Sequence, residues 1–169
     1  YSAVNAGREV CPSLRSSKRW FLDGEGSNAS IFAVARYEEE GLSPADQDIV
    51  LAFVNLDRDS DQADRFIIPE QLVDCLGLSE TTIYNVKNIA AYERPPSVTG
   101  RREAWLWGGG LTGKQLQEDG FSVFLNKVPT SDTEWDSAPY EVQYLKLFET
   151  GSILADDDGD GVTTGDEII

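Results

Sequence analysis

The C-terminal residues of this chain carry oxygen-bearing side chains at the spacing that a calcium ion requires. Carboxylates stand at the alternate positions 156, 158 and 160, a glycine follows at 161 where a sharp turn is needed, and an acidic residue at 167 closes the loop. Calcium takes roughly six to eight oxygen ligands at about 2.3–2.6 Å. The predicted ligands are Asp156, Asp158, Asp160, the carbonyl of Val162, Thr164 (directly or through water) and Glu167.

A solvated acidic tail is the plain alternative, but such a tail needs neither this register nor the turn glycine. The segment resembles a single calcium loop of the dockerin or thrombospondin type 3 kind, which is common in the tails of secreted bacterial proteins. The resemblance implies a role in stability and spacing. Residues 151–155 are predicted to form a hinge between this tail and the body of the chain.

The composition excludes several classes of function. The formal net charge of −16 disfavours nucleic acid, because phosphate binding needs clustered Lys and Arg. The same charge favours cations and neutral partners such as sugars. The absence of His excludes Ser-His-Asp and Cys-His catalysis and zinc sites built on imidazole. No apolar run approaches the roughly 18 residues of a membrane span.

Cys11 and Cys75 are the only cysteines, too few for a zinc site. In an exported protein they can pair, and a disulfide that closes so long a loop stabilises by about 4 kcal/mol in the chain-entropy model. Two buried thiols are the alternative. The chain starts at Tyr1 with neither an initiator Met nor a signal peptide, so we expect it to be a piece of a longer protein.

Alternating apolar and polar residues indicate short strands separated by turn residues. They predict an all-β fold, an antiparallel β-sandwich of the Greek-key type. Residues 49–56 are apolar on both faces and should form a central strand. Residues 1–17 indicate a short N-terminal helix, and 69–76 one or two helical turns. At 140–148 the spacing of the apolar residues fits both a strand and a helix, and a helix is slightly favoured. The other predicted strands are 19–22, 30–37, 66–68, 81–89, 104–107 and 121–128.

Several segments near the N-terminus, taken in order, carry a family resemblance. The stretch REVCPSLR at 8–15 is followed by RWFL at 19–22, then by IFAVAR at 31–36 and by 49–56, which includes Asn55. The first two look like the end of the catalytic (β/α)8 barrel and the start of the C-terminal β-sandwich in the α-amylase family of glycoside hydrolases. The last two are similar to the I-x-A-x-x-R and V-x-V-x-x-N strands of that sandwich.

The resemblance implies a non-catalytic accessory domain of a secreted bacterial enzyme that acts on α-glucans such as starch and glycogen. Residues 1–16 would then be a remnant of the upstream barrel, 17–150 the accessory sandwich, and 151–169 the hinge and calcium tail. The catalytic carboxylates would lie upstream of Tyr1, and none is carried over to this chain. The implied partners are Ca²⁺ and the barrel, whose apolar flank this domain would cover and stabilise, in an extracellular or periplasmic setting.

Two other roles remain open. An independent carbohydrate-binding module would use exposed aromatic rings that stack on sugar rings. The candidates are Trp105, Trp107, Trp135 and Tyr140. The first two would share one face of the strand predicted at 104–107, where packing in the core explains them equally well. A calcium-dependent adhesion or anchoring domain is the second alternative.

Two further motifs are assigned to loops. Residues 108–114 fit G-x4-G-K, but Gln115 offers no hydroxyl for Mg²⁺ and too few residues follow for a full helix, so we predict a loop between strands. Four carboxylates lie in one turn, and there a solvated acidic loop is favoured over a second calcium site. These residues are Asp57, Asp59, Asp61 and Asp64.

Overall fold

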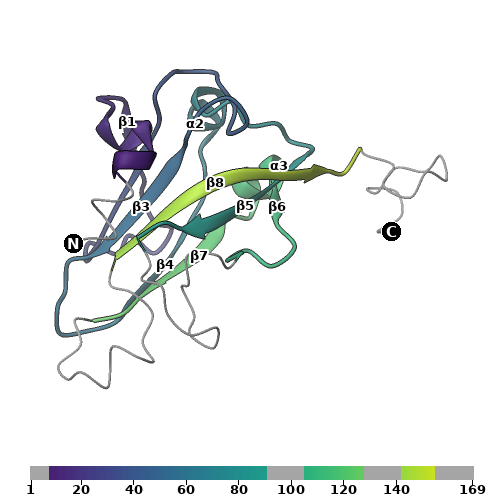
Figure 1. Cartoon of the computed structure of the whole chain (residues 1–169). Helices are drawn as coiled ribbons and strands as arrows, with labels where there is room; N and C mark the ends of the chain where they lie inside the picture. The colour runs from purple at the N-terminus through teal and green to yellow at the C-terminus, as the bar shows by residue number, and fades with distance from the viewer. Residues whose placement is uncertain (1–7, 91–104, 128–141, 155–169) are drawn as a thin grey trace.

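The computed structural model describes residues 8–90, 105–127 and 142–154 (Figure 1). Its main element is an antiparallel six-stranded sheet in the order β1-β2-β3-β8-β5-β6, and β4 and β7 pair antiparallel in a second, small sheet. The prediction of an all-β, sandwich-like fold is confirmed. The strands are β1 (Arg19–Phe21), β2 (Ile31–Arg36), β3 (Val50–Asn55), β4 (Gln62–Phe66), β5 (Thr82–Asn88), β6 (Leu111–Thr112), β7 (Phe121–Leu125) and β8 (Val142–Ser152).

The main core lies between the two sheets. The small sheet and two short helices, α2 (Glu70–Cys75) and α3 (Gly113–Glu118), bury apolar side chains against one face of the large sheet, which we call the inner face. Three rings from three strands meet there. Phe53 lies 5.0 Å from Phe66 and 5.9 Å from Phe121 between ring centroids, within the range that favours tilted and edge-on pairs. The opposite side of the large sheet is the outer face.

The central strand β3 is apolar on both sides because both sides are covered at its N-terminal end. Leu51 and Phe53 point into the main core. Val50 is buried on the outer face, where it packs with Cys11 and Ile89. The N-terminal segment therefore lies on the outer face. Residues 8–10 are helical and Pro12–Arg15 form the 3-10 helix η1, in accord with the expected short N-terminal helix.

The helix favoured at 140–148 is wrong, because β8 is a strand from Val142 to Ser152. It pairs with β3 on one side and β5 on the other, so the hydrogen bonds of neighbouring strands decide its conformation. Leu145 and Leu147 point to the inner core. The residues between and beside them, which alternate with the core residues, are Tyr144, Lys146 and Phe148.

Smaller differences concern the connections. β4 starts and ends earlier than the strand predicted at 66–68. Where a strand was predicted at 104–107, residue 105 has no regular structure and residues 106 and 107 form bends. The loop predicted at 108–114 includes β6 and the start of α3. That helix begins with a capping box, in which Thr112 and Gln115 each accept a hydrogen bond from the other's backbone N–H. Gly151, predicted to open a hinge, belongs to β8.

The two cysteines are not bonded to each other. Cys11 is buried on the outer face, whereas Cys75 ends α2 beside the main core and contacts the hydroxyl of Tyr37. The two cysteines lie on opposite sides of the large sheet. Of the two alternatives, a disulfide or two thiols, the structure therefore shows thiols. Among the described residues, no helix has the length and apolar character needed to cross a membrane.

The carboxylate of Asp64 fastens the β1–β2 connection to β4. It accepts hydrogen bonds from the backbone N–H groups of Gly26 at 2.7 Å, Asn28 at 3.1 Å and Arg65 at 2.7 Å. A Cβ added to Gly24 would lie 2.0 Å from a carboxylate oxygen of Asp64, so a side chain there would displace this carboxylate. Burial alone raises the pKa of Asp64, but the three N–H donors outweigh it, and the pKa lies below its usual value.

Because the folded-state pKa of Asp64 is lowered, its stabilising effect is present above the unfolded pKa of about 3.9 and is lost as the pH falls through the folded value. We expect Asp64→Ala to lower the free energy of unfolding by about 1–3 kcal/mol at pH 7, and the deficit relative to the parent chain to shrink below pH 4. Urea titrations at both pH values measure this. Asp59→Ala is the matched control, since that side chain is 87% exposed. An equal deficit at pH 7 and pH 3 contradicts the assignment.

Candidate functional site

The predicted calcium ligands Asp156, Asp158, Asp160, Val162, Thr164 and Glu167 lie outside the described residues, so the calcium loop stays a prediction. Within the described part of the chain, no group of three His, Cys, Asp or Glu is placed to hold a metal ion. The acidic residues of the β3–β4 turn each bond a different backbone segment. The Asp57 carboxylate accepts a hydrogen bond from the backbone N–H of Asp59, and the Asp61 carboxylate accepts one from the N–H of Lys127. The Asp64 carboxylate accepts its hydrogen bonds from the β1–β2 connection.

Of the four aromatic residues considered for sugar binding, Trp135 and Tyr140 lie outside the described residues. The other two do not share a face. Trp107 packs against the main core, with its ring centroid 4.9 Å from that of Phe121. Trp105 is 44% exposed and lies elsewhere, beside Phe148. The expectation that both rings would line one face of a strand is therefore wrong, and Trp107 has a structural role.

Trp105 belongs to a group of aromatic rings and cations on β5 and β8. The Lys87 ammonium lies 4.4 Å from the Trp105 ring centroid, and the Phe148 ring stands edge-on to Trp105 at 5.5 Å. Lys146 lies 5.2 Å from the Phe148 centroid and pairs with the Asp48 carboxylate at 3.0 Å. Both lysines thus have partners inside the fold, through cation–π contacts and one half-buried ion pair.

The other end of the outer face is apolar and open. Phe21 on the edge strand β1 is 57% exposed and Phe32 on β2 is 42% exposed, and their rings meet edge-on at 5.8 Å. Singly exposed apolar residues are ordinary, but a contiguous apolar surface marks a place of interaction. Here it forms the floor of a pocket of about 780 Å³. The apolar floor consists of Phe21, Phe32, Val34, Ala52, Val54 and Tyr144.

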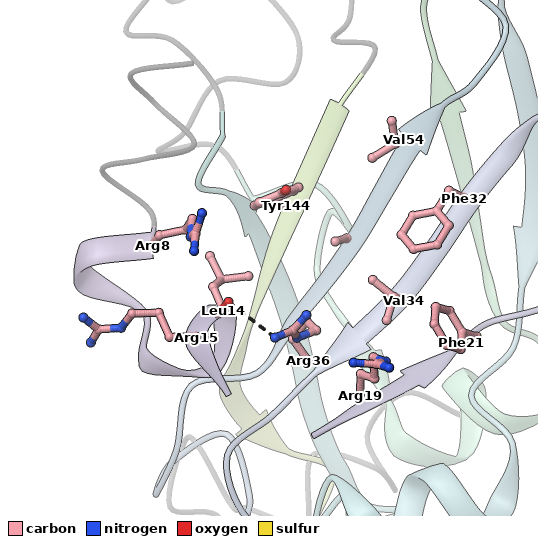
Figure 2. A pocket seen from close by; sticks show the side chains of 11 residues that line it. Arg8, Leu14, Arg15, Arg19, Phe21, Phe32, Val34, Arg36, Val54 and Tyr144 are labelled. Carbon is pink, nitrogen blue, oxygen red and sulfur yellow. Dashed lines mark hydrogen bonds between the residues drawn. The ribbon is translucent and has the colours of Figure 1, made fainter. Parts of the chain in front are cut away.

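Four arginines from the N-terminal segment, β1 and β2 line the pocket along one side of this floor (Figure 2). Arg36, on β2, donates to the backbone carbonyls of Leu14 (3.4 Å) and Ser16, and so holds the N-terminal segment on the sheet. The guanidinium of Arg19 lies 5.7 Å from the Phe21 ring centroid. No carboxylate is among the described residues that line the pocket. We call this surface the arginine pocket; its cations are Arg8, Arg15, Arg19 and Arg36.

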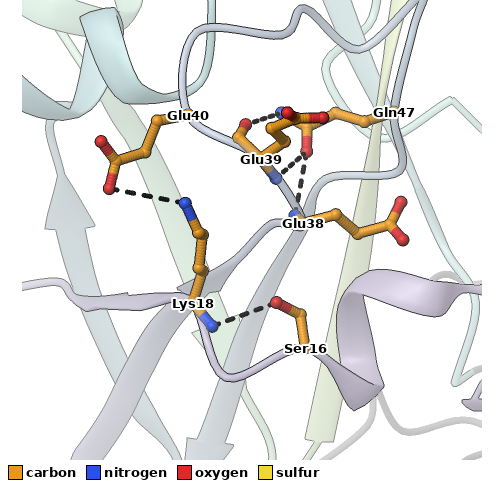
Figure 3. A network of polar contacts seen from close by, with 6 residues as sticks. All are labelled: Ser16, Lys18, Glu38, Glu39, Glu40 and Gln47. Carbon is orange, nitrogen blue, oxygen red and sulfur yellow. Dashed lines mark hydrogen bonds and ion pairs between the residues drawn. The ribbon is translucent and has the colours of Figure 1, made fainter.

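A buried glutamine shapes the long β2–β3 connection beside the arginine pocket (Figure 3). The Gln47 side chain accepts from the N–H groups of Glu38 at 2.9 Å and Glu39 at 3.0 Å. Its amide donates to the carbonyls of Glu39 at 2.8 Å and Leu42 at 2.6 Å. All four hydrogen bonds of the amide are made within one loop, so this cluster is structural despite its acidic surroundings. Lys18 and Glu40 form a long exposed ion pair across it, at 3.9 Å.

Comparison with models of protein families gave no match, and comparison with curated proteins gave none either. The resemblance to the accessory sandwich of α-amylase-type enzymes therefore stays a prediction.

The arginine pocket was missed from the sequence, although a signal for it exists. Arg19 and Phe21 alternate with Trp20, and Phe32, Val34 and Arg36 alternate with alanines. Because successive residues of a strand point to opposite faces, both runs place arginine and apolar side chains on one face. What the sequence alone does not give is the pairing of β1 with β2, in which Arg19 lies opposite Arg36 and Phe21 opposite Val34.

The two tryptophans should differ in their effect on stability. We expect Trp107→Ala to lower the free energy of unfolding by about 3 kcal/mol, because it empties space beside Phe121 in the core. Trp105→Ala, the matched control, removes an exposed ring and one cation–π contact and should cost about 1 kcal/mol or less. Urea unfolding followed by far-UV circular dichroism measures both. Equal losses would show that the two rings are not packed differently.

Proposed function

We propose that this chain is a non-catalytic accessory β-sandwich of a secreted α-amylase-type glycoside hydrolase that acts on α-glucans. The proposal rests on the family resemblance and on where its segments lie in the fold. The turn at Pro12–Arg15 and the strands β1, β2 and β3 follow one another along the chain. The three strands are neighbours in the large sheet, paired antiparallel. Segments that resemble one contiguous junction are thus contiguous in space.

The observation that carries the proposal is the contact of Arg36 with the N-terminal segment. Arg36 is the arginine of the I-x-A-x-x-R motif, and it bonds the carbonyls of Leu14 and Ser16 in the segment that resembles the end of a barrel helix. A charged hydrogen bond of this kind stabilises more than a neutral one. It fixes the entering chain against the sheet, as an accessory domain joined rigidly to a preceding domain requires.

Asn55, the asparagine of the other motif, also joins separate segments. Its amide donates to the carbonyls of Ser60 and Asn126, both at 2.9 Å, and its side-chain oxygen accepts from the N–H of Asp57 at 2.8 Å. It therefore ties the end of β3 to the β3–β4 turn and to the end of β7. Both polar residues of the motifs hold the sandwich together, which supports a scaffold role for them.

The activity of the chain tests the proposal. The protein extended through the coding sequence upstream of Tyr1 should release reducing sugar from soluble starch, and residues 1–169 alone should release none above buffer. Turnover by the isolated chain that is abolished by one Asp→Asn or Glu→Gln change would refute the accessory role. An extended protein without activity on α-glucans would refute the family.

The proposal includes one calcium ion held by the C-terminal loop. Isothermal titration of residues 1–169 with CaCl₂ should show one binding site, and Asp158→Ala with Asp160→Ala should abolish the binding heat, because two of the carboxylate ligands are removed. Asp57→Ala with Asp59→Ala, which removes the same charge from the β3–β4 turn, is the control and should leave the heat unchanged. Equal heats from the parent chain and the loop variant would contradict the calcium site.

A further inference from the structure

The arginine pocket gathers positive charge with no carboxylate among the described residues that line it. Four of the 14 basic residues of a protein with net charge −16 line one pocket, and no carboxylate among the described residues lines it with them. By contrast, the basic residues Lys18, Arg58, Arg65 and Lys146 all lie within 4 Å of a carboxylate. Clustered like charges repel one another, so the arrangement is favourable once an anionic group lies among them.

The floor of the pocket adds a second requirement, because it is apolar. Phe21 and Phe32 are exposed on the outer face, and Tyr144 and Val54 extend the floor across β8 and β3. Arginine around an aromatic centre is the composition of protein–protein interfaces, whereas scattered surface charge is not. The occupant that fits both features is a folded surface with apolar side chains surrounded by carboxylates.

The path of the chain identifies where such a surface comes from. Arg8, the first described residue, itself lines the pocket, so the described chain begins at the edge of this surface (Figure 2). A second copy of the chain would have to overcome the repulsion between two bodies of net charge −16. A domain joined through a short linker instead has an effective concentration of roughly millimolar, which offsets that repulsion.

We infer that the arginine pocket is the docking surface for the folded domain that precedes Tyr1, and that it binds an apolar patch of that domain surrounded by Asp and Glu. This rests on the proposed function in that it takes a preceding domain in the same polypeptide, and it adds the face and the chemistry of the contact. Arg8, Arg15 and Arg19 are the exposed cations that meet the partner carboxylates. Arg36, on β2, positions the N-terminal segment at the junction with the preceding domain.

Hydroxyl-radical footprinting of the extended protein and of residues 1–169 compares the two states directly. We expect oxidation of Phe21 and Phe32 in the extended protein to fall to the level of Phe53, which is 0% exposed. Phe124, 47% exposed on β7 of the small sheet, is the internal control and should be oxidised equally in both. Equal oxidation of Phe21 and Phe32 in the two proteins would overturn the docking surface.

A charge reversal tests the chemistry. In the extended protein, Arg15→Glu with Arg19→Glu should restore oxidation of both rings to the level of the isolated chain. Arg58→Glu with Lys114→Glu, an equal charge change at exposed sites away from the pocket, should leave them protected. Protection that survives the reversal at Arg15 and Arg19 would overturn the carboxylate contact.

The outcomes separate this inference from the proposed function. A preceding domain that protects Phe21 and Phe32 but has no activity on α-glucans refutes the enzyme family and supports the docking surface. A starch-active protein in which both rings stay exposed refutes the docking surface alone. A coding sequence without a folded domain upstream of Tyr1 refutes both.

Discussion

The whole fold depends on the insertion of β8 between β3 and β5. This last strand pairs with β3 through Val142–Lys146 and with β5 through Leu145–Ser152, so it joins two halves of the sheet that the earlier chain leaves apart. Because side chains alternate across a strand, the same residues complete both faces. Leu145 and Leu147 close the main core, while Tyr144 completes the floor of the arginine pocket. Such long-range pairing is entropically costly to form, and neither face exists without it.

The two ends of the outer face differ in the partners of their positively charged side chains. Around β5 and the middle of β8, Lys87 lies over Trp105, and Lys146 pairs with Asp48, so the fold itself supplies the partners. At β1 and β2 the arginines lie beside apolar side chains and have no carboxylate among the described residues of the pocket. A surface evolved only for solubility in a chain of this net charge would not gather its cations over exposed phenylalanines. The difference marks the end at β1 and β2 as the place where another surface belongs.

The local pattern of apolar residues was sufficient to predict strands with one buried face. It failed where pairing with strands distant in the sequence decides the conformation. β2, β5 and β7 follow from alternation and β3 from its continuous apolar run, with ends that differ by a few residues from the predicted ones. At 140–148 tyrosine, leucine and phenylalanine recur at helical spacing, which slightly favours a helix although alternation also fits, and only the two partner strands of β8 settle the question. The capping box at Thr112 and Gln115 marks the start of α3 and can be recognised from the sequence, although we predicted a loop there. The arginine pocket needs residues from β1, β2, β3, β8 and the N-terminal segment, and their meeting is a property of strand order.

The same strand separates the two roles proposed for this chain. Tyr144 lies in the arginine pocket, whereas Ser152 ends β8 on the far side of the sheet (Figure 1). Eight residue steps separate these positions and span about 27 Å at about 3.4 Å per residue in an antiparallel strand. Electrostatic effects between exposed charges decay over about 8 Å at physiological ionic strength. A calcium ion held just beyond that end of β8 would therefore change little of the potential around Arg15 and Arg19. The proposed docking through the pocket and the proposed calcium binding at the tail would then contribute independently to the stability of the proposed parent protein.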